Sequence, residues 1–455
     1  MFAVYASIDR RPITNYEEVR QRTSARRFPP SRPIWWDEHE PVIVWSDRRL
    51  EMLADRVIGI GNVRLDNAED LASRFAATAG YATEWDVILS AYELSGSRAL
   101  RTLSGEFAFV IWNRAERELF AVRDPLGLMT LYYSITGDGI LIADRLSSFE
   151  ASGDYDKEFI VDFIATGGCC ATRTIWSGVL PVPPGAMLRW KDGVLRCERY
   201  WSADDIEPAL DSSDMADAAL EFRGLLESAV LKRLEAGRRT WAQLSGGLDS
   251  SSVVAIAATL GKKGLTNSSL GGTITQTDSL GTADDPSFAE AVVRRFGIRN
   301  EQIVDDWPWR RDGEPPPLTD QPSRDYAFYA RDRYMTRIIK DAGGTSLLSG
   351  IGPDVYFPSV FSHIPDLIWK HRMDQGIAEL RRWTVSRNES LWRTVPVHVV
   401  MPLAAPSLRN WWQNRRLQAQ LAYKEIREPV RFSRASRGRQ KRGPPPRLVL
   451  WRFCC

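Results

Sequence analysis

Short apolar runs, separated by charged residues and turns, mark the first part of the chain. Phe107–Trp112 and Leu119–Val122 are two of the clearest runs. Segments of this length, rich in aromatic and β-branched residues, are typical of strands. We therefore expect an all-β or α/β sandwich layer over residues 1–150.

The apolar period becomes helical from Met215. One face of the predicted amphipathic helix carries Ala219, Phe222, Leu225, Leu226, Ala229, Val230 and Leu234. Further along, we expect strands at Thr240–Leu244, Leu270–Thr275 and Thr345–Leu348, and helices after the first strand and at Ser287–Phe296. Strands that alternate with helices predict an α/β domain with a parallel, doubly wound sheet, which binds its ligands at the carboxyl ends of the strands.

These changes of pattern divide the 455 residues into four parts. The predicted parts are a sandwich domain at 1–150, a connector at 151–214, an α/β domain at 215–426 and a basic tail at 427–455. A rigid turn at Pro181–Gly185 marks the connector. The tail is rich in Arg and interrupted by Pro444–Pro446, so we expect it to be poorly ordered or truncated.

Composition excludes several classes of function. With 60 basic and 58 acidic residues, the formal charge of +2 gives no reason to expect nucleic acid as a partner. The chain has no run of about eighteen apolar residues and no secretory signal, so we expect a cytoplasmic protein with no membrane partner. Only four His residues occur, and the five cysteines have no CxxC spacing, so neither a zinc site nor a disulfide framework is expected.

The segment Ser245–Ser251, with the sequence SGGLDSS, lies between a predicted strand and a predicted helix. Gly246 and Gly247 allow a tight turn and a close approach of the backbone, and free amides at a helix start bind phosphate oxygens. Because the segment lacks a Gly-Lys-Ser/Thr ending, it fits pyrophosphate rather than a transferred γ-phosphate. Asp249 is the candidate Mg²⁺ ligand. Further hydroxyl donors are Ser245, Ser250 and Ser251. The alternative is a Gly-rich turn with a capping Asp, which the complete run between a strand and a helix disfavours.

A second candidate segment follows the last predicted strand. Ser349–Asp354 has the sequence SGIGPD and could bring the Asp354 carboxylate to the same metal. Two strand ends that converge on magnesium pyrophosphate would neutralise charge on the leaving group of an adenylation. Taken alone, the segment fits a loop with a capping Asp equally well.

Both segments resemble the asparagine synthetase family. The resemblance extends over about residues 45–370 and includes Gly105–Trp112, Arg123–Gly127, Leu131–Tyr133, Leu180–Gly185, Arg199–Trp201 and Asp284–Ala289. It implies an Ntn-hydrolase-like αββα sandwich, of the degenerate glutaminase type, followed by an ATP-pyrophosphatase domain of the adenine nucleotide alpha hydrolase-like type. It further implies ATP and Mg²⁺ as cofactors. ATP would be bound by Leu244, Ser245, Gly246, Gly247, Leu248, Asp249, Ser250, Ser251, Ser349 and Gly350, and the catalytic metal ligands would be Asp249 and Asp354.

The chain departs from the family at three places. Phe2 stands where glutamine-hydrolysing members have a Cys whose free α-amine acts as its base, so a thiol glutaminase is not expected. Ile351 stands where such members usually have Glu, which argues mildly against free aspartate as the substrate. The family's C-terminal W-R-x-x-K segment is matched only by Trp451–Arg452, without its Lys. Lys424 and Lys441 fit ordinary surface positions better than that role.

The missing Cys is shared with β-lactam synthetase and with the cyclases that close lasso peptides. The resemblance therefore predicts an AMP-forming carbon–nitrogen ligase that adenylates a carboxylate and transfers the acyl group to an amine, closing the macrolactam of a lasso precursor peptide. Its partners would be that precursor peptide, or another carboxylate and amine substrate, and a leader protease. The alternatives are asparagine synthesis from aspartate with ammonia or glutamine, and a non-catalytic relative. Either a peptide groove or an ordinary core accounts for Trp307, Trp309, Tyr326, Tyr329 and Tyr334.

Overall fold

The computed structural model divides into two compact units, Met1–Ile351 and Gly352–Cys455. The structure describes residues 1–8, 12–22, 33–53, 55–75, 83–149, 154–168, 171–206, 215–234, 239–266, 270–277, 286–304, 321–323, 326, 328–353, 363–369, 371–387, 390, 395–401, 404 and 407–408. Asp354, both Trp residues of the suggested peptide groove, and the predicted tail at 427–455 lie outside this set. Within it, no helix has the length and apolar character needed to cross a membrane.

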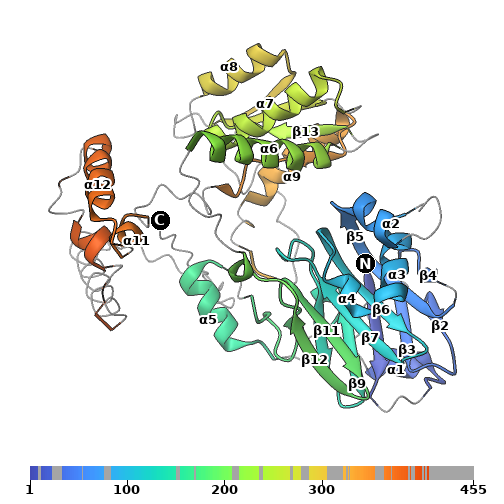
Figure 1. Ribbon diagram of the computed structural model, residues 1–455. Helices are drawn as coiled ribbons and strands as arrows, with labels where there is room; N and C mark the ends of the chain where they lie inside the picture. Colours follow the sequence, from blue (N-terminus) through green and yellow to red (C-terminus); the bar gives the residue numbers. More distant parts are fainter. Residues whose placement is uncertain are drawn as a thin grey trace, which may run out of the picture. The chain divides into compact units, whose positions relative to one another are not determined.

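The N-terminal part of the first unit contains two six-stranded antiparallel sheets (Figure 1). The first sheet has the order β10-β8-β9-β1-β3-β2, with bounds Leu180–Pro181, Tyr132–Ile135, Gly139–Ala143, Phe2–Ser7, Val42–Ser46 and Trp35–Trp36. The second has the order β12-β11-β7-β6-β5-β4, with bounds Val194–Arg199, Ala186–Lys191, Glu118–Arg123, Gly105–Asn113, Val57–Leu65 and Glu51–Leu53. The two sheets pack face to face.

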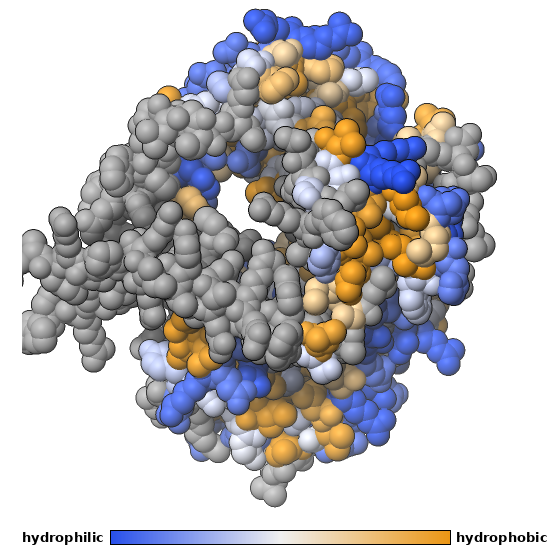
Figure 2. Space-filling view, turned by 90° about the vertical axis from the view of Figure 1, so that its left-hand side faces the viewer, coloured by the Kyte–Doolittle hydropathy of each residue, from blue (hydrophilic) through white to orange (hydrophobic). Residues whose placement is uncertain are grey.

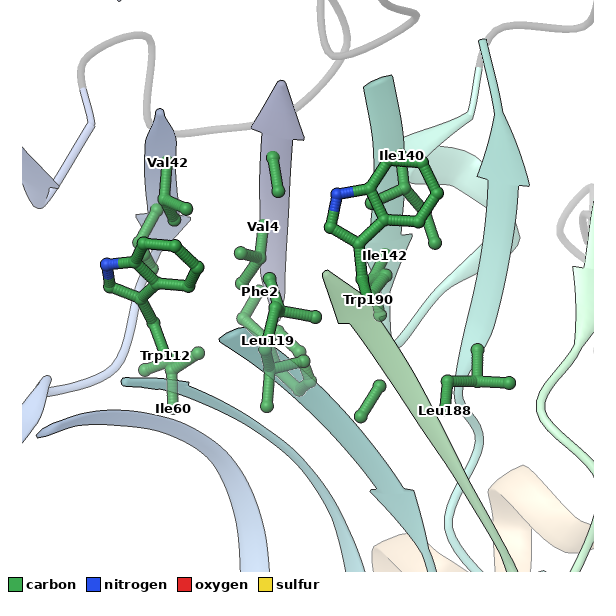
Figure 3. Close-up of a cluster of buried hydrophobic side chains, with 14 of the residues drawn as sticks. Phe2, Val4, Val42, Ile60, Trp112, Leu119, Ile140, Ile142, Leu188 and Trp190 are labelled. Atoms are coloured by element: carbon green, nitrogen blue, oxygen red, sulfur yellow. The ribbon is translucent and has the colours of Figure 1, made fainter. Parts of the chain in front are cut away.

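Alternation along the strands builds one core between the sheets and further cores outside them. Val4 of β1 and Val110 of β6 point into the space between the sheets, where Figure 3 shows their neighbours. The next residue along β6 in the N-terminal direction, Phe109, faces outward into a second core. That core is covered by α2, α3 and α4, at Ala68–Phe75, Glu84–Ser95 and Ser97–Leu100. On the other side, α1 at Tyr16–Arg22 covers the first sheet with Val19. The predicted αββα sandwich is confirmed.

The segment predicted as a connector contributes to the sandwich. Its strands β10, β11 and β12 extend both sheets, and β11 pairs with β7 in a register that places Met187 opposite Val122. It also contains α5 at Lys157–Thr166, whose first turn is capped by the Asp156 side chain. Two short 3₁₀ turns lie at Leu146–Ser148 and Ala203–Asp205.

The Arg-Asp-Pro-Leu-Gly motif, which begins at the last residue of β7, holds these segments together. Asp124 is fully buried, and its carboxylate accepts hydrogen bonds from three backbone amides, those of Leu126, Leu128 and Met129. The Arg123 guanidinium donates to three carbonyls, those of Gly127, Met129 and Val182. Burial lowers the pKa of Arg123. This part of the family resemblance therefore reflects a structural requirement of the sandwich rather than chemistry.

The C-terminal part of the first unit contains a four-stranded parallel sheet with the order β15-β14-β13-β16. These strands are Asn300–Val304, Gly272–Thr277, Thr240–Gln243 and Ser346–Leu348. On one face, Trp241 packs against α9 at Tyr329–Asp341. The other face packs against α7 at Leu248–Lys262 and α8 at Pro286–Phe296. Helices on both faces of a parallel sheet confirm the predicted doubly wound architecture.

The amphipathic face predicted from Met215 is buried only over its second half. It forms α6, Met215–Arg233, in which Val230 is 4% exposed and packs with α7. Phe222 and Leu225, earlier in the same helix, are 50% and 65% exposed. The predicted helix is confirmed, and the first half of its apolar face is exposed, because periodicity identifies an apolar face but not the element that covers it.

The second unit is described by itself over three helices. They are α11 at His363–Trp369, α12 at Met373–Arg387 and a π-helical turn at Pro396–Val400. Ile364 and Val399 form a small core there, with Ile368 and Leu380 packed against it.

Candidate functional site

The site predicted from the two Ser-Gly segments lies at a switch point of the parallel sheet. From β13 the chain continues to β14 and β15 on one side, whereas β16 lies on the other side of β13. β13 and β16 are directly paired, with Trp241 opposite Leu347 and Ala242 opposite Leu348. The loops that follow these strands therefore start at the same edge of the sheet, the edge at which doubly wound sheets bind ligands. The predicted convergence of the two strand ends is confirmed.

The first loop turns sharply from β13 into α7. Leu244 is fully buried and donates its amide to the carbonyl of Ile274 at 2.9 Å, which ties the loop to the neighbouring strand. Gly246 has a φ of 92°, a conformation that favours glycine. Gly247 precedes the first turn of α7 and provides no side-chain cap. The first amides of the helix lack intrahelical acceptors by geometry, so they are free to bind an anion.

The hydroxyl of Ser250 holds this loop in shape. Ser250 is 6% exposed, and its Oγ accepts a hydrogen bond from the amide of Ser245 at 3.1 Å. It also lies 3.0 Å from the Ser245 Oγ. Both Ser hydroxyls, predicted as ligand donors, thus take part in the internal hydrogen bonding of the loop. No sequence signal distinguished this role.

Ser251 behaves differently. Its Oγ is buried and has no hydrogen-bond partner among the residues that the structure describes. A buried hydroxyl without a partner is unfavourable unless a ligand supplies one. This orphaned donor lies in the first turn of α7, beside the free amides, and so suits a bound phosphate oxygen.

The second loop packs directly on the first. A Cβ added to Gly350 would lie 2.6 Å from the Ser250 nitrogen and 3.0 Å from the Asp249 carbonyl carbon. Only glycine allows the two backbones to come this close. The hydroxyl of Ser349 accepts a hydrogen bond of 3.1 Å from the amide of Ile351. This residue, predicted to bind the ligand, therefore also stabilises its own loop.

Asp249 is the one predicted metal ligand within the described residues, and it is half-buried in the first turn of α7. Its carboxylate has no ion-pair or hydrogen-bond partner among them. The described residues contain no group of three or more potential metal ligands. Mg²⁺ commonly takes one or two protein carboxylates and completes its shell with phosphate oxygens and water. An unpartnered carboxylate beside the glycine-rich loop Ser245–Ser251 fits that requirement.

Three other residues singled out in the sequence belong to the core of the parallel sheet or to the sandwich. Tyr334 packs against the core that contains Trp241, which favours the core alternative for this residue. Phe2 is fully buried between the two sheets, and its amide donates to Asp144 Oδ1 at 2.9 Å. Cys197 is an exposed free cysteine within β12.

Comparison with known families gives two matches in chain order. Residues 63–201 match the family model described as a glutamine amidotransferase domain. Residues 221–445 match the model described as asparagine synthase. The second match contains both loops of the candidate site.

Individual relatives are distant. The chain is 27% identical over 258 residues to glutamine-hydrolyzing asparagine synthetase 3 of Bacillus subtilis, covering 52% of this chain and 41% of that protein. It is 29% identical over 228 residues to the amidase chry2 of Gibberella zeae, covering 48% and 34%. The chain thus spans less than half the length of these two relatives. A solved structure, glutamine phosphoribosylpyrophosphate amidotransferase from B. subtilis, aligns with a TM-score of 0.28 at 14% identity over 76% of this chain and 84% of that one, a score too low to carry an argument.

Proposed function

Because the chain belongs to the asparagine synthetase-like family, we propose that it is an ATP-dependent ligase that forms an amide bond through an acyl-adenylate. The observation that carries this proposal is the close approach of Gly350 to Ser250. It joins a glycine-rich phosphate loop to the end of the neighbouring strand at the switch point of the sheet. That arrangement suits a nucleotide whose pyrophosphate leaves.

In the proposed first step, an oxygen of the substrate carboxylate attacks the α-phosphorus of ATP. The bond from that phosphorus to the bridging oxygen breaks, and pyrophosphate leaves. The free amides of the first turn of α7 and the Ser251 hydroxyl would hold its oxygens. Asp249, with Asp354 as the second proposed ligand, would hold Mg²⁺, which supplies positive charge at the leaving group.

In the second step, an amine attacks the acyl carbon, the bond to the adenylate oxygen breaks, and AMP leaves while the amine loses a proton. We propose that the substrate itself carries this amine, as in closure of a lasso precursor peptide. Two features support that choice. Phe2 replaces the thiol that would release ammonia from glutamine, and Ile351 replaces a carboxylate usual in enzymes that use free aspartate.

Exchange of labelled pyrophosphate into ATP tests the proposal. The purified protein should catalyse exchange only when Mg²⁺ and a suitable carboxylate are both present, and Asp249→Asn should remove most of it. Exchange with free aspartate, followed by asparagine formation from ammonia, would favour the asparagine synthetase alternative. No exchange with any carboxylate tested would favour the non-catalytic alternative and overturn the proposal.

A further inference from the structure

Two large apolar side chains project into solvent at the candidate site. Leu248 is 86% exposed and Ile351 is 85% exposed, the highest values for large apolar side chains among the described residues of the first unit. Elsewhere on the surface, apolar side chains emerge in several separate groups (Figure 2). Single exposed aliphatic residues need no explanation. Here, however, the two most exposed ones lie on the two loops of one candidate site.

The backbone fixes these two residues close to each other. Leu248 directly precedes Asp249, and Ile351 directly follows Gly350, whose α-carbon packs against Asp249 and Ser250. Leu248 is also the first residue of α7, and the Ile351 amide donates to Ser349 Oγ. Both positions are therefore defined by hydrogen-bonded structure.

We infer that Leu248 and Ile351 form an apolar lip that selects the acyl substrate. This inference rests on the proposed function, in which the reacting carboxylate must reach the α-phosphate beside these loops. The part of the substrate next to the carboxylate then covers both aliphatic side chains and removes them from water, which is favourable for an uncharged segment.

The chemistry of the substrate follows from this contact. Free aspartate carries an ammonium group and a second carboxylate near the reacting carboxyl, and both would lose water against the lip without gaining a partner. An Asp or Glu inside a peptide has neutral amides in their place. The lip therefore favours a peptide-embedded or blocked acid over a free amino acid.

Pyrophosphate exchange with two matched probes tests the inference. The probes are free L-aspartate and N-acetyl-L-aspartic acid α-amide, which share the reacting carboxyl but differ in charge. The wild type should prefer the blocked probe by about tenfold or more in kcat/KM, in line with the penalty for desolvating an unpaired charge. Ile351→Gln should reduce this preference severalfold, mainly through KM for the blocked acid, and leave KM for ATP unchanged. Ile164→Gln, a change of a 75% exposed residue on α5, is the matched control and should leave the preference intact.

Each other result overturns the inference. Equal use of both probes by the wild type would show that the lip does not select. A raised KM for ATP in Ile351→Gln would assign the lip to the nucleotide, and a large fall in its melting temperature would assign it to packing within the chain. These results do not contradict the proposed ligase function. If neither probe nor a peptide acid supports exchange, both the inference and the proposed function are wrong.

Discussion

The α-carbon of Gly350 packs so closely on the backbone of Ser250 that a Cβ at position 350 would lie 2.6 Å from the Ser250 nitrogen. The two residues are far apart in sequence, and each follows one of two paired parallel strands. This contact joins the two loops of the candidate site, and it makes the geometry of the Ser245–Ser251 loop depend on a residue outside that loop.

Gly350→Ala should therefore disable the site while the fold persists. The added methyl must push the second loop away from α7, because the atoms it meets are backbone and cannot rotate aside. Overpacking of this kind commonly costs about 1–3 kcal/mol, and misplacement of reacting groups by about 1 Å can lower rates by about a hundredfold. We expect pyrophosphate exchange to fall by that order with an unchanged far-ultraviolet circular dichroism spectrum.

Gly224→Ala is the matched control. Gly224 lies in α6, and a Cβ there would meet nothing within 4 Å. That variant should keep full activity and gain up to about 1 kcal/mol of stability from better helix propensity. Near-normal exchange in Gly350→Ala would show that the loops do not act as one site.

The two Ser residues at the start of α7 should respond differently to substitution. Ser250→Ala removes the acceptor of the Ser245 amide, so the protein without ligand should lose about 1–3 kcal/mol. Ser251→Ala removes a buried hydroxyl with no partner among the described residues, so the stability of the protein without ligand should stay equal or rise.

Thermal unfolding with and without magnesium-ATP separates these effects. A ligand that binds only the native state raises the melting temperature according to its affinity. Ser251→Ala should show a melting temperature equal to or above that of the wild type and a reduced shift with ATP. If that shift equals the wild-type shift, Ser251 does not bind the nucleotide.

Much of this site follows from local sequence. The strand that became β13, the glycine turn and the helix α7 each carry their own signal, namely an apolar run, two adjacent glycines and a helical period. Because parallel strands end at one edge, even the meeting of the two loops could be predicted. The internal bonding of Ser250 could not, since a Ser in such a loop can bind either a ligand or its own backbone.

The structure of the connector could not be predicted from local sequence. Leu188 and Trp190 of β11 are buried in the core between the sheets because β11 pairs with β7, a partner distant in sequence. Pairing between strands that are distant in sequence leaves no local pattern that identifies the partner strand. The clearest local signal in the connector was Pro181–Gly185, which predicts only a turn. The exposed first half of α6 has the same origin, because tertiary packing decides which part of an apolar face is covered.

Asp249→Asn and Asp354→Asn should each remove most of the magnesium-dependent exchange and leave the fold intact, because each deletes one negative charge from the proposed metal shell. For Asp249 the substitution breaks no ion pair or hydrogen bond with the described residues. Exchange should be measured across a range of Mg²⁺ concentrations. If a variant reaches the wild-type exchange rate at the same Mg²⁺ concentration as the wild type, the substituted residue is not a metal ligand.

Stability should depend on pH through Glu118 in the sandwich. Its side chain is 8% exposed, and Arg189 Nη2 and Lys191 Nζ each lie 2.5 Å from Oε1. Burial alone would raise the pKa of Glu118, but the hydrogen bonds from Arg189 and Lys191 outweigh it and hold that pKa below its usual range. A lowered pKa in the folded state contributes stability above the unfolded value of about 4.3, and this contribution is lost as the pH falls through the folded value.

Glu118→Gln should therefore be less stable than the wild type by about 1–2 kcal/mol at pH 7, with a difference that shrinks as the pH falls below about 4. Urea unfolding at a series of pH values measures it. Glu116→Gln serves as the control, since Glu116 is 65% exposed and should contribute little. A difference that stays constant down to pH 3 would mean that the ion pairs do not cause it.

Glutamine should not be hydrolysed by the sandwich domain. Hydrolysis in this family needs a thiolate that attacks the side-chain amide and a free α-amine that takes the proton. The position that the resemblance assigns to this nucleophile holds Phe2, which is buried between the sheets. Cys197, the free cysteine of the described residues, lies within β12, so its own α-amine is part of a peptide bond.

Purified protein incubated with glutamine should release glutamate at the same background rate as its Cys197→Ala variant. Release above that of the variant would identify Cys197 as a nucleophile, and equal release well above the rate in buffer would mean that another group hydrolyses the amide. The sandwich would then supply ammonia, and the argument for a substrate-borne amine would lose its chemical basis.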